Sequence, residues 1–164
     1  MLNTWRVLCL FVLATVFHWA LVSLFARWGI SANIILVFVT AFCAVLRPSL
    51  AYSLAFVCGL FLDFYSVKLF GNNAFTFTVC ACLICNIVDR FDFEELFPQM
   101  VAVFCLSWLA GLLNAFLVAV FASSSVWPGL ASMVGGAVLN AVFAPAIFWI
   151  TNRVVGDSSW RRQG

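Results

Sequence analysis

The sequence predicts an all-α integral membrane protein, a bundle of six or, alternatively, five transmembrane helices. Hydrophobic residues make up 66% of the 164 residues, charged residues make up 9%, and the mean hydropathy is +1.15. Soluble domains carry about a quarter charged residues. The chain also divides into apolar segments that approach the roughly 20 residues needed to cross a bilayer. These segments account for residues 1–164 as a single transmembrane domain.

The polar residues exclude several classes of function. Eight Lys and Arg and six Asp and Glu are scattered through the predicted loops, so no nucleic-acid-binding patch is expected. No Ser-His-Asp or Cys-His set and no phosphate-binding glycine loop occurs, so we expect no enzymatic activity and no cofactor. Cys80-x-Cys82-x-x-Cys85 has metal-like spacing but lies in an apolar segment without His, so we expect no metal site.

The first predicted span runs from Val7 to Phe25. Trp5-Arg6 and Arg27-Trp28 flank it, as is typical of the two membrane interfaces. No cleavage pattern of small residues follows, which indicates a retained span, not a signal peptide. His18 in its middle is either a proton or substrate ligand or, as we favour, a neutral imidazole hydrogen-bonded inside the bundle.

The second and third predicted spans are Ile30 to Leu46 and Ser49 to Leu62. Ser31-Ala32-Asn33 supplies polar side chains that cap a helix N-terminus. Proline disfavours helical geometry at Arg47 and suits a first helical turn, so Arg47-Pro48 predicts a tight turn. One kinked helix over residues 31–62 would be about 48 Å long in about 30 Å of hydrocarbon. It would also leave Arg47 in mid-membrane at roughly 2.5–3.5 kcal/mol.

Three more spans complete the prediction: Phe70 to Val88, Pro98 to Phe121 and Trp127 to Thr151. Asp92, Glu94 and Glu95 precede the span that begins at Pro98, and carboxylates near a helix N-terminus favour a helix start there. A partner-docking loop is the competing interpretation.

The last two spans carry small residues four apart, a spacing that lets helices approach closely. Asn114 and Asn140 can hydrogen-bond across a helix interface. These positions serve either internal packing or the binding of a partner's span. The small pairs are Ser107 and Gly111, Ser132 and Gly136, and Ala137 and Ala141.

Arg and Lys positions predict the orientation, since basic residues favour the cytoplasmic side. The six-span arrangement with a cytoplasmic N-terminus gives six basic residues inside and two outside; five spans with an external N-terminus give five against two. Both arrangements place the C-terminus in the cytoplasm. In the six-span arrangement the inside residues are Arg6, Arg47, Arg90, Arg153, Arg161 and Arg162, and the outside residues are Arg27 and Lys68.

The segment from Ala55 to Phe75 carries the most informative polar residue, Asp63, at the end of an apolar span and before a Gly-Asn-Asn turn. A buried carboxylate needs a partner, and Lys68 is the nearest candidate cation. Gly59, one helical turn earlier, leaves room for a neighbouring helix. Asp63 is therefore either a polar docking point for a partner's transmembrane helix or an interfacial residue that finishes a helix.

This region resembles the MreD family of rod shape-determining membrane proteins. The small all-helical chain and its short basic C-terminal tail are similar to that family too. The residues that carry the resemblance are Asn33-Ile34-Ile35-Leu36, Arg47-Pro48, Ala55-Phe56, Gly59-Leu60-Phe61-Leu62-Asp63, Ser66 and Gly71.

The resemblance implies a non-enzymatic subunit of the bacterial cell-elongation complex in the cytoplasmic membrane. It implies binding to the bitopic scaffold MreC, and through it a link between MreB filaments and two wall synthases, RodA and a class B penicillin-binding protein. Gly59, Asp63, Gly71 and Asn72 are the matching positions expected to bind a partner.

The alternative is the substrate-binding subunit of an energy-coupling-factor vitamin transporter, also a small six-span bundle. Such subunits typically carry Ala-x-x-x-Ala on the first span, whereas here Ala14 is followed four residues later by His18. That spacing occurs instead at Ala51 and Ala55 and at Ala137 and Ala141. A shared fold would not decide between these functions.

Overall fold

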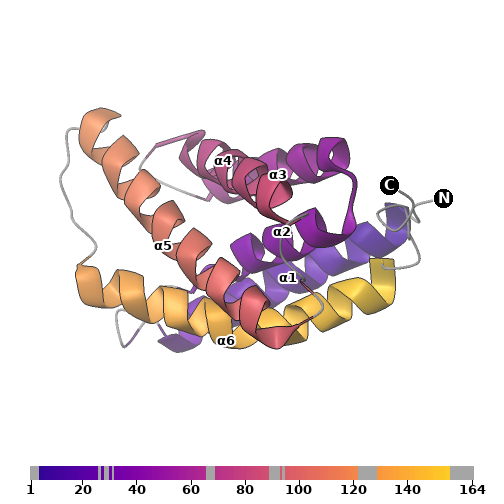
Figure 1. Cartoon of the computed structure of the whole chain (residues 1–164). Helices are drawn as coiled ribbons and strands as arrows, with labels where there is room; N and C mark the ends of the chain where they lie inside the picture. Colours follow the sequence, from indigo (N-terminus) through magenta and orange to yellow (C-terminus); the bar gives the residue numbers. More distant parts are fainter. Residues whose placement is uncertain are drawn as a thin grey trace.

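The structure is a computed structural model that describes residues 4–25, 27, 30, 32–65, 69–88, 93, 95–121 and 129–155. These residues form helices and connecting turns, with no strand among them, which confirms the predicted all-α fold (Figure 1). The helices are α1 (Thr4–Phe25), α2 (Ile34–Val45), α3 (Pro48–Asp63), α4 (Asn72–Ile87), α5 (Leu96–Phe121) and α6 (Leu130–Val155).

The helices fall into two length classes. α1 from Trp5, α5 and α6 are each long and apolar enough to cross a membrane. α2 has 12 residues, and α3 and α4 have 16 each. At 1.5 Å per residue these three are about 18 Å and 24 Å long, shorter than the roughly 30 Å of hydrocarbon.

α2 is the central helix of the bundle. Residues 34–43 are all buried, as expected for a helix that is apolar on every side. It contacts each of the other five helices. Figure 1 shows it between α3 and α4 on one side and α1 and α6 on the other. Because protein surrounds α2, its length does not have to match the hydrocarbon thickness.

α2 and α3 are separate helices. Leu46 and Arg47 between them are extended, with ψ of 161° and 143°, and Pro48 occupies the first turn of α3. The Asn33 side chain caps α2 by accepting a hydrogen bond from Leu36 N at 3.3 Å. The predicted cap and the turn at Arg47-Pro48 are therefore confirmed, and the alternative of one kinked helix is wrong.

Polar side chains of α5 and α6 join helices inside the chain. Asn140 donates from Nδ2 to Ser107 Oγ at 3.0 Å and accepts from Asn33 N at 2.9 Å, so it links α6 to both α5 and α2. The small-residue position Gly111 lies against the Met133 side chain. Of the two interpretations of these positions, internal packing is the one the structure supports.

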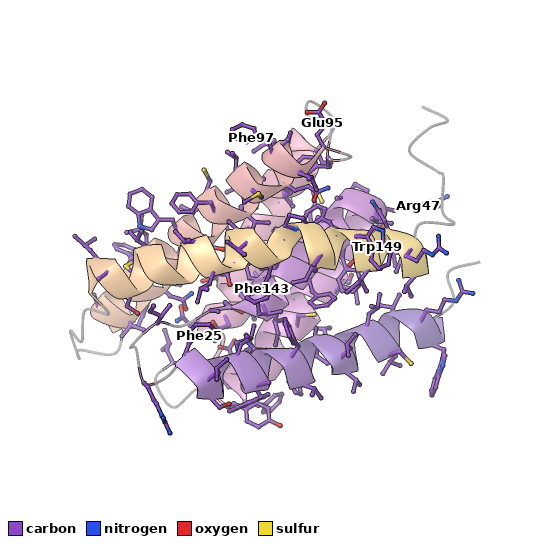
Figure 2. The ribbon with its side chains drawn as sticks, turned by 90° about the horizontal axis from the view of Figure 1, so that it is seen from below. Phe25, Arg47, Glu95, Phe97, Phe143 and Trp149 are labelled. Atoms are coloured by element: carbon purple, nitrogen blue, oxygen red, sulfur yellow. The ribbon has the colours of Figure 1, made fainter. Side chains whose placement is uncertain are left out.

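α1 lies along α6. Figure 2 shows Phe143 directed from α6 towards α1, where its ring meets that of Phe17 at a centroid distance of 5.6 Å. At the other end of the pair, Arg6 Nη1 donates to Val154 O at 3.4 Å. The start of α1 and the end of α6 therefore lie at the same end of the bundle.

Two expectations at single residues have different outcomes. Glu95 is exposed and directly precedes α5, so the predicted helix start is confirmed, two residues earlier than Pro98; Asp92 and Glu94 lie outside the described residues. His18 was expected to be hydrogen-bonded. Its Nδ1 is buried without a hydrogen-bond partner among the residues that the structure describes.

Candidate functional site

The Asp63 carboxylate binds the N-terminus of α4. Asp63 is 1% exposed at the last position of α3. Its Oδ1 accepts from Asn73 N at 2.9 Å and Asn73 Nδ2 at 3.0 Å, and its Oδ2 accepts from Ala74 N at 3.0 Å. The positive end of the α4 dipole also favours a carboxylate at this point. Asp63 thus caps a helix that begins nine residues later in the chain.

This cap completes the hydrogen bonding of the first turn of α4. The first four N–H groups of a helix have no partner from within the helical repeat. Here Asn72 N donates to Leu69 O, and Asn73 N and Ala74 N donate to Asp63, before Phe75 N makes the first hydrogen bond of the repeat, to Gly71 O. The N–H groups from Asn72 to Ala74 therefore all have acceptors, as buried backbone groups require.

Gly71 explains why the cap comes from another helix. It occupies the N-cap position with φ of 89°, in the left-handed region that glycine adopts without steric cost. The N-cap residue usually supplies the capping side chain, and glycine has none. Asp63 provides the missing acceptor.

Gly59 lets the two helices approach. A Cβ atom at Gly59 would lie 2.5 Å from Ala74 Cα, 2.5 Å from Asn73 O and 2.6 Å from Ala74 N. All three are backbone atoms, so no side-chain rotation could make room. The predicted close approach one turn before Asp63 is confirmed, and the approaching helix is α4 of the same chain.

Asn72 fixes the same turn to α5. Its side chain is 7% exposed, and its Nδ2 donates to Asn114 Oδ1. Asn114 Nδ2 in turn donates to Ala110 O at 2.9 Å. Asn72 Oδ1 is buried and unpartnered within the described residues. The hairpin made by α3 and α4 is therefore anchored both within itself and to α5.

The structure thus brings the four predicted site residues, Gly59, Asp63, Gly71 and Asn72, together at one junction between α3 and α4. All of them are engaged inside the chain. Lys68, the cation expected for Asp63, and Ser66 lie outside the described residues. Among the residues that the structure describes, backbone and side-chain N–H groups bind the carboxylate.

Aromatic side chains form the exposed tip of this hairpin. We call Phe64 and Phe70, which are 71% and 63% exposed, the hairpin tip. Their rings meet edge to face with centroids 5.5 Å apart. Next to them, Tyr65 contacts Trp19 of α1 at 5.5 Å and Phe61 at 5.3 Å. The tip offers apolar aromatic surface on a backbone that the Asp63 cap holds in place.

The sequence pattern linked neither Asn73 nor Asn114 to this site, although it indicated that Asn114 can hydrogen-bond across a helix interface. Asn73 makes two of the three hydrogen bonds to Asp63, and Asn114 holds Asn72. An Asn-Asn pair directly after a glycine is a helix-start signal that could have pointed to Asn73. No local rule connects Asn72 with Asn114, because they lie 42 residues apart.

A comparison with protein families shows which family the chain is similar to. The family model described as rod shape-determining protein MreD matches residues 1–154, nearly the whole chain. No curated protein and no solved structure matches the chain.

Proposed function

Because the chain belongs to the MreD family, whose role is the determination of rod cell shape, we propose that it is a non-enzymatic subunit of the cell-elongation complex. In this proposal it binds the bitopic scaffold MreC within the cytoplasmic membrane. Through MreC it helps couple MreB filaments to the peptidoglycan synthases RodA and a class B penicillin-binding protein.

One observation carries the proposed mode of binding: the fixed α3–α4 hairpin with its exposed aromatic tip. A buried carboxylate that caps α4 removes conformational freedom from the hairpin, which lowers the entropic cost of binding a partner. Aromatic side chains, Phe among them, are enriched at protein interfaces, and both Phe residues of the tip are exposed. Gly59, Asp63, Gly71 and Asn72 therefore act as positioning residues, and the hairpin tip contacts a transmembrane helix of the partner.

We further propose that all six helices cross the membrane, with both termini in the cytoplasm. The hydrogen bond between Arg6 and Val154 O supports an even number of spans, because it brings the start of α1 next to the end of α6. The short helices α3 and α4 cross if the bilayer thins locally beside them, as lipids do around short spans. The basic residues counted from the sequence give the orientation.

The test is purification of the tagged protein from its native membranes in a gentle detergent, with identification of every co-purifying polypeptide. MreC, with or without the wall synthases, is the expected result. Two ATPase subunits with a coupling transmembrane protein would replace the proposal with the vitamin-transporter alternative. Recovery without MreC would contradict the proposed partner.

A further inference from the structure

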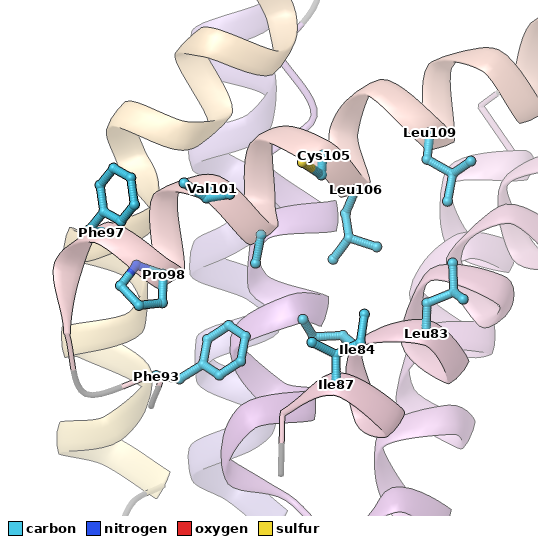
Figure 3. A pocket seen from close by; sticks show the side chains of 11 residues that line it. Leu83, Ile84, Ile87, Phe93, Phe97, Pro98, Val101, Cys105, Leu106 and Leu109 are labelled. Atoms are coloured by element: carbon cyan, nitrogen blue, oxygen red, sulfur yellow. The ribbon is translucent and has the colours of Figure 1, made fainter. Parts of the chain in front are cut away.

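An apolar groove lies between α4 and α5, away from the hairpin tip. It has a volume of about 450 Å³ and an almost wholly apolar lining (Figure 3). Leu83, Ile84 and Ile87 form the α4 wall, and Phe93 and Pro98 close one end. On α5 the lining continues through Phe97, Val101, Ala102, Cys105, Leu106 and Leu109.

The groove is a preformed feature of the surface. Phe93, at its end, is held by a hydrogen bond from Gln99 Nε2 to its carbonyl oxygen at 2.7 Å. The Phe93 ring also stacks on Phe148 of α6, with centroids 6.2 Å apart and planes 10° apart. The groove opens outward, since Ile87, Val101 and Cys105 among its lining residues are exposed.

The dimensions select the occupant. From Pro98 to Leu109 the groove follows α5 for about 16 Å, close to half of the roughly 30 Å of hydrocarbon, which is one leaflet. The groove holds about 450 Å³ over that length and is open along one side, so it can seat a slender apolar chain along its floor. Helix–helix contacts in membranes also favour small residues, and Ala102 is the one small aliphatic residue in the lining.

Charge at the mouth of the groove selects the head group. Glu95 is exposed one turn before Pro98, at the end that Phe97 and Phe93 mark (Figures 2 and 3). The sequence that joins α4 to α5 carries four acidic residues and one arginine over positions 89–95. Anionic head groups are bound by basic clusters, whereas the exposed carboxylate of Glu95 attracts a head group with an ammonium.

We propose that this groove binds one acyl chain of a phospholipid whose amine head group meets Glu95. Under the proposed orientation this is a lipid of the cytoplasmic leaflet. The site is separate from the hairpin tip, so its occupancy does not depend on the partner.

Native mass spectrometry tests the proposal on protein purified in equal amounts of phosphatidylethanolamine and phosphatidylglycerol with identical acyl chains. The protein should retain phosphatidylethanolamine in preference by about three- to fivefold, the ratio that one exposed ion pair supports. Ala102→Phe fills the groove and should abolish retention, while Ala119→Phe, at an exposed position of the same helix outside the groove, should leave it unchanged. Glu95→Gln should keep an acyl chain bound but remove the preference.

Two results would overturn the proposal. One is that Ala102→Phe retains as much phospholipid as the unmodified protein, and the other is that the unmodified protein retains as much or more phosphatidylglycerol than phosphatidylethanolamine.

A second measurement uses the unmodified protein and so does not depend on the folding of a variant. Cys105 lines the groove, whereas Cys9 and Cys82 are exposed elsewhere. Phosphatidylethanolamine should slow maleimide labelling of Cys105 relative to the other two; equal slowing of all three, or cross-linking of Cys105 to a partner's helix, would refute an acyl chain as occupant.

Discussion

At Gly59 a single hydrogen atom in place of a side chain decides how closely α3 and α4 meet. The backbone of Asn73 and Ala74 occupies the space that a Cβ would need. The same backbone segment supplies the N–H groups that bind Asp63. Close approach and capping are therefore coupled, because a shift of α4 away from Gly59 also lengthens the hydrogen bonds to Asp63.

Gly59→Ala should lower the free energy of unfolding in detergent by about 2–3 kcal/mol, at the upper end of what overpacking costs. Gly111→Ala is the matched control, because a Cβ there would meet only the flexible end of Met133 at 2.9 Å. That control should change stability by less than about 1 kcal/mol, since alanine also favours the helix. Equal melting temperatures for the two variants would contradict the close approach at Gly59.

At the scale of helices, asparagine side chains connect elements that are distant in the sequence. Asn140 reaches both the N-terminus of α2 and Ser107 of α5, and Asn114 reaches the start of α4. Such hydrogen bonds between membrane helices contribute modestly, about 0.6 kcal/mol on average and about 1.7 at most. These hydrogen bonds determine which faces of the helices meet, and they add little to the total stability.

A double-mutant cycle with Ser107→Ala and Asn140→Ala measures one of these contacts. The coupling free energy should lie between about 0.5 and 1.7 kcal/mol, from the range for side-chain hydrogen bonds in membranes. Asn114→Ala combined with Ser107→Ala provides the control, because these two side chains bind different partners. A coupling of zero between Ser107 and Asn140 would show that the contact contributes nothing to folding.

The sequence predicted where each helix lies along the chain better than it predicted which helices pack around it. Hydropathy and the Arg47-Pro48 turn located α2 and α3 to within four residues at every end. Neither signal revealed that α2 is the central helix, because a segment that is apolar on all sides is equally suited to lipid and to protein. Burial of α2 depends on how five other helices surround it, which no local pattern records.

For the whole molecule, the membrane topology is inferred from the start of α1 and the end of α6. Arg6 and Val154 lie together, so α1 begins and α6 ends at the same end of the bundle, and the distribution of basic residues favours the proposal that this end faces the cytoplasm. The sequence left five and six spans open, because each gave an acceptable excess of basic residues inside.

A reporter fused to the N-terminus should therefore read cytoplasmic, as should one fused to the C-terminus. The physical reason is the proposed even number of crossings, which places Arg6, Arg47 and Arg153 on the same side. A reporter inserted within the segment 122–128, which is predicted to be external, is the control and should read external. An external N-terminus together with a cytoplasmic C-terminus would contradict six spans.

The candidate site, like the fold, could be predicted only in part. Local sequence identifies unusual residues, but it does not show which residues they contact. Asp63 and Gly59 are unusual residues in an apolar segment, so composition singled them out, and the resemblance to the MreD family added Gly71 and Asn72. Their partner could not be identified, because Asp63 pairs with Asn73 and Ala74 through the folding of the hairpin. A sequence does not distinguish a carboxylate that binds another protein from one that caps a neighbouring helix.

In the proposed mode of binding, the Asp63 cap positions a hairpin whose tip binds the scaffold. The most direct test quantifies MreC that co-purifies with the tagged protein and with two variants, alongside their melting temperatures. Asp63→Leu leaves the buried Ala74 N and the partly buried Asn73 N without acceptors, at about 1–3 kcal/mol for a fully buried group. It should insert normally, melt at a lower temperature and recover much less MreC. Phe64→Ala combined with Phe70→Ala should recover equally little MreC at an unchanged melting temperature, whereas wild-type amounts of MreC with either variant would contradict the account.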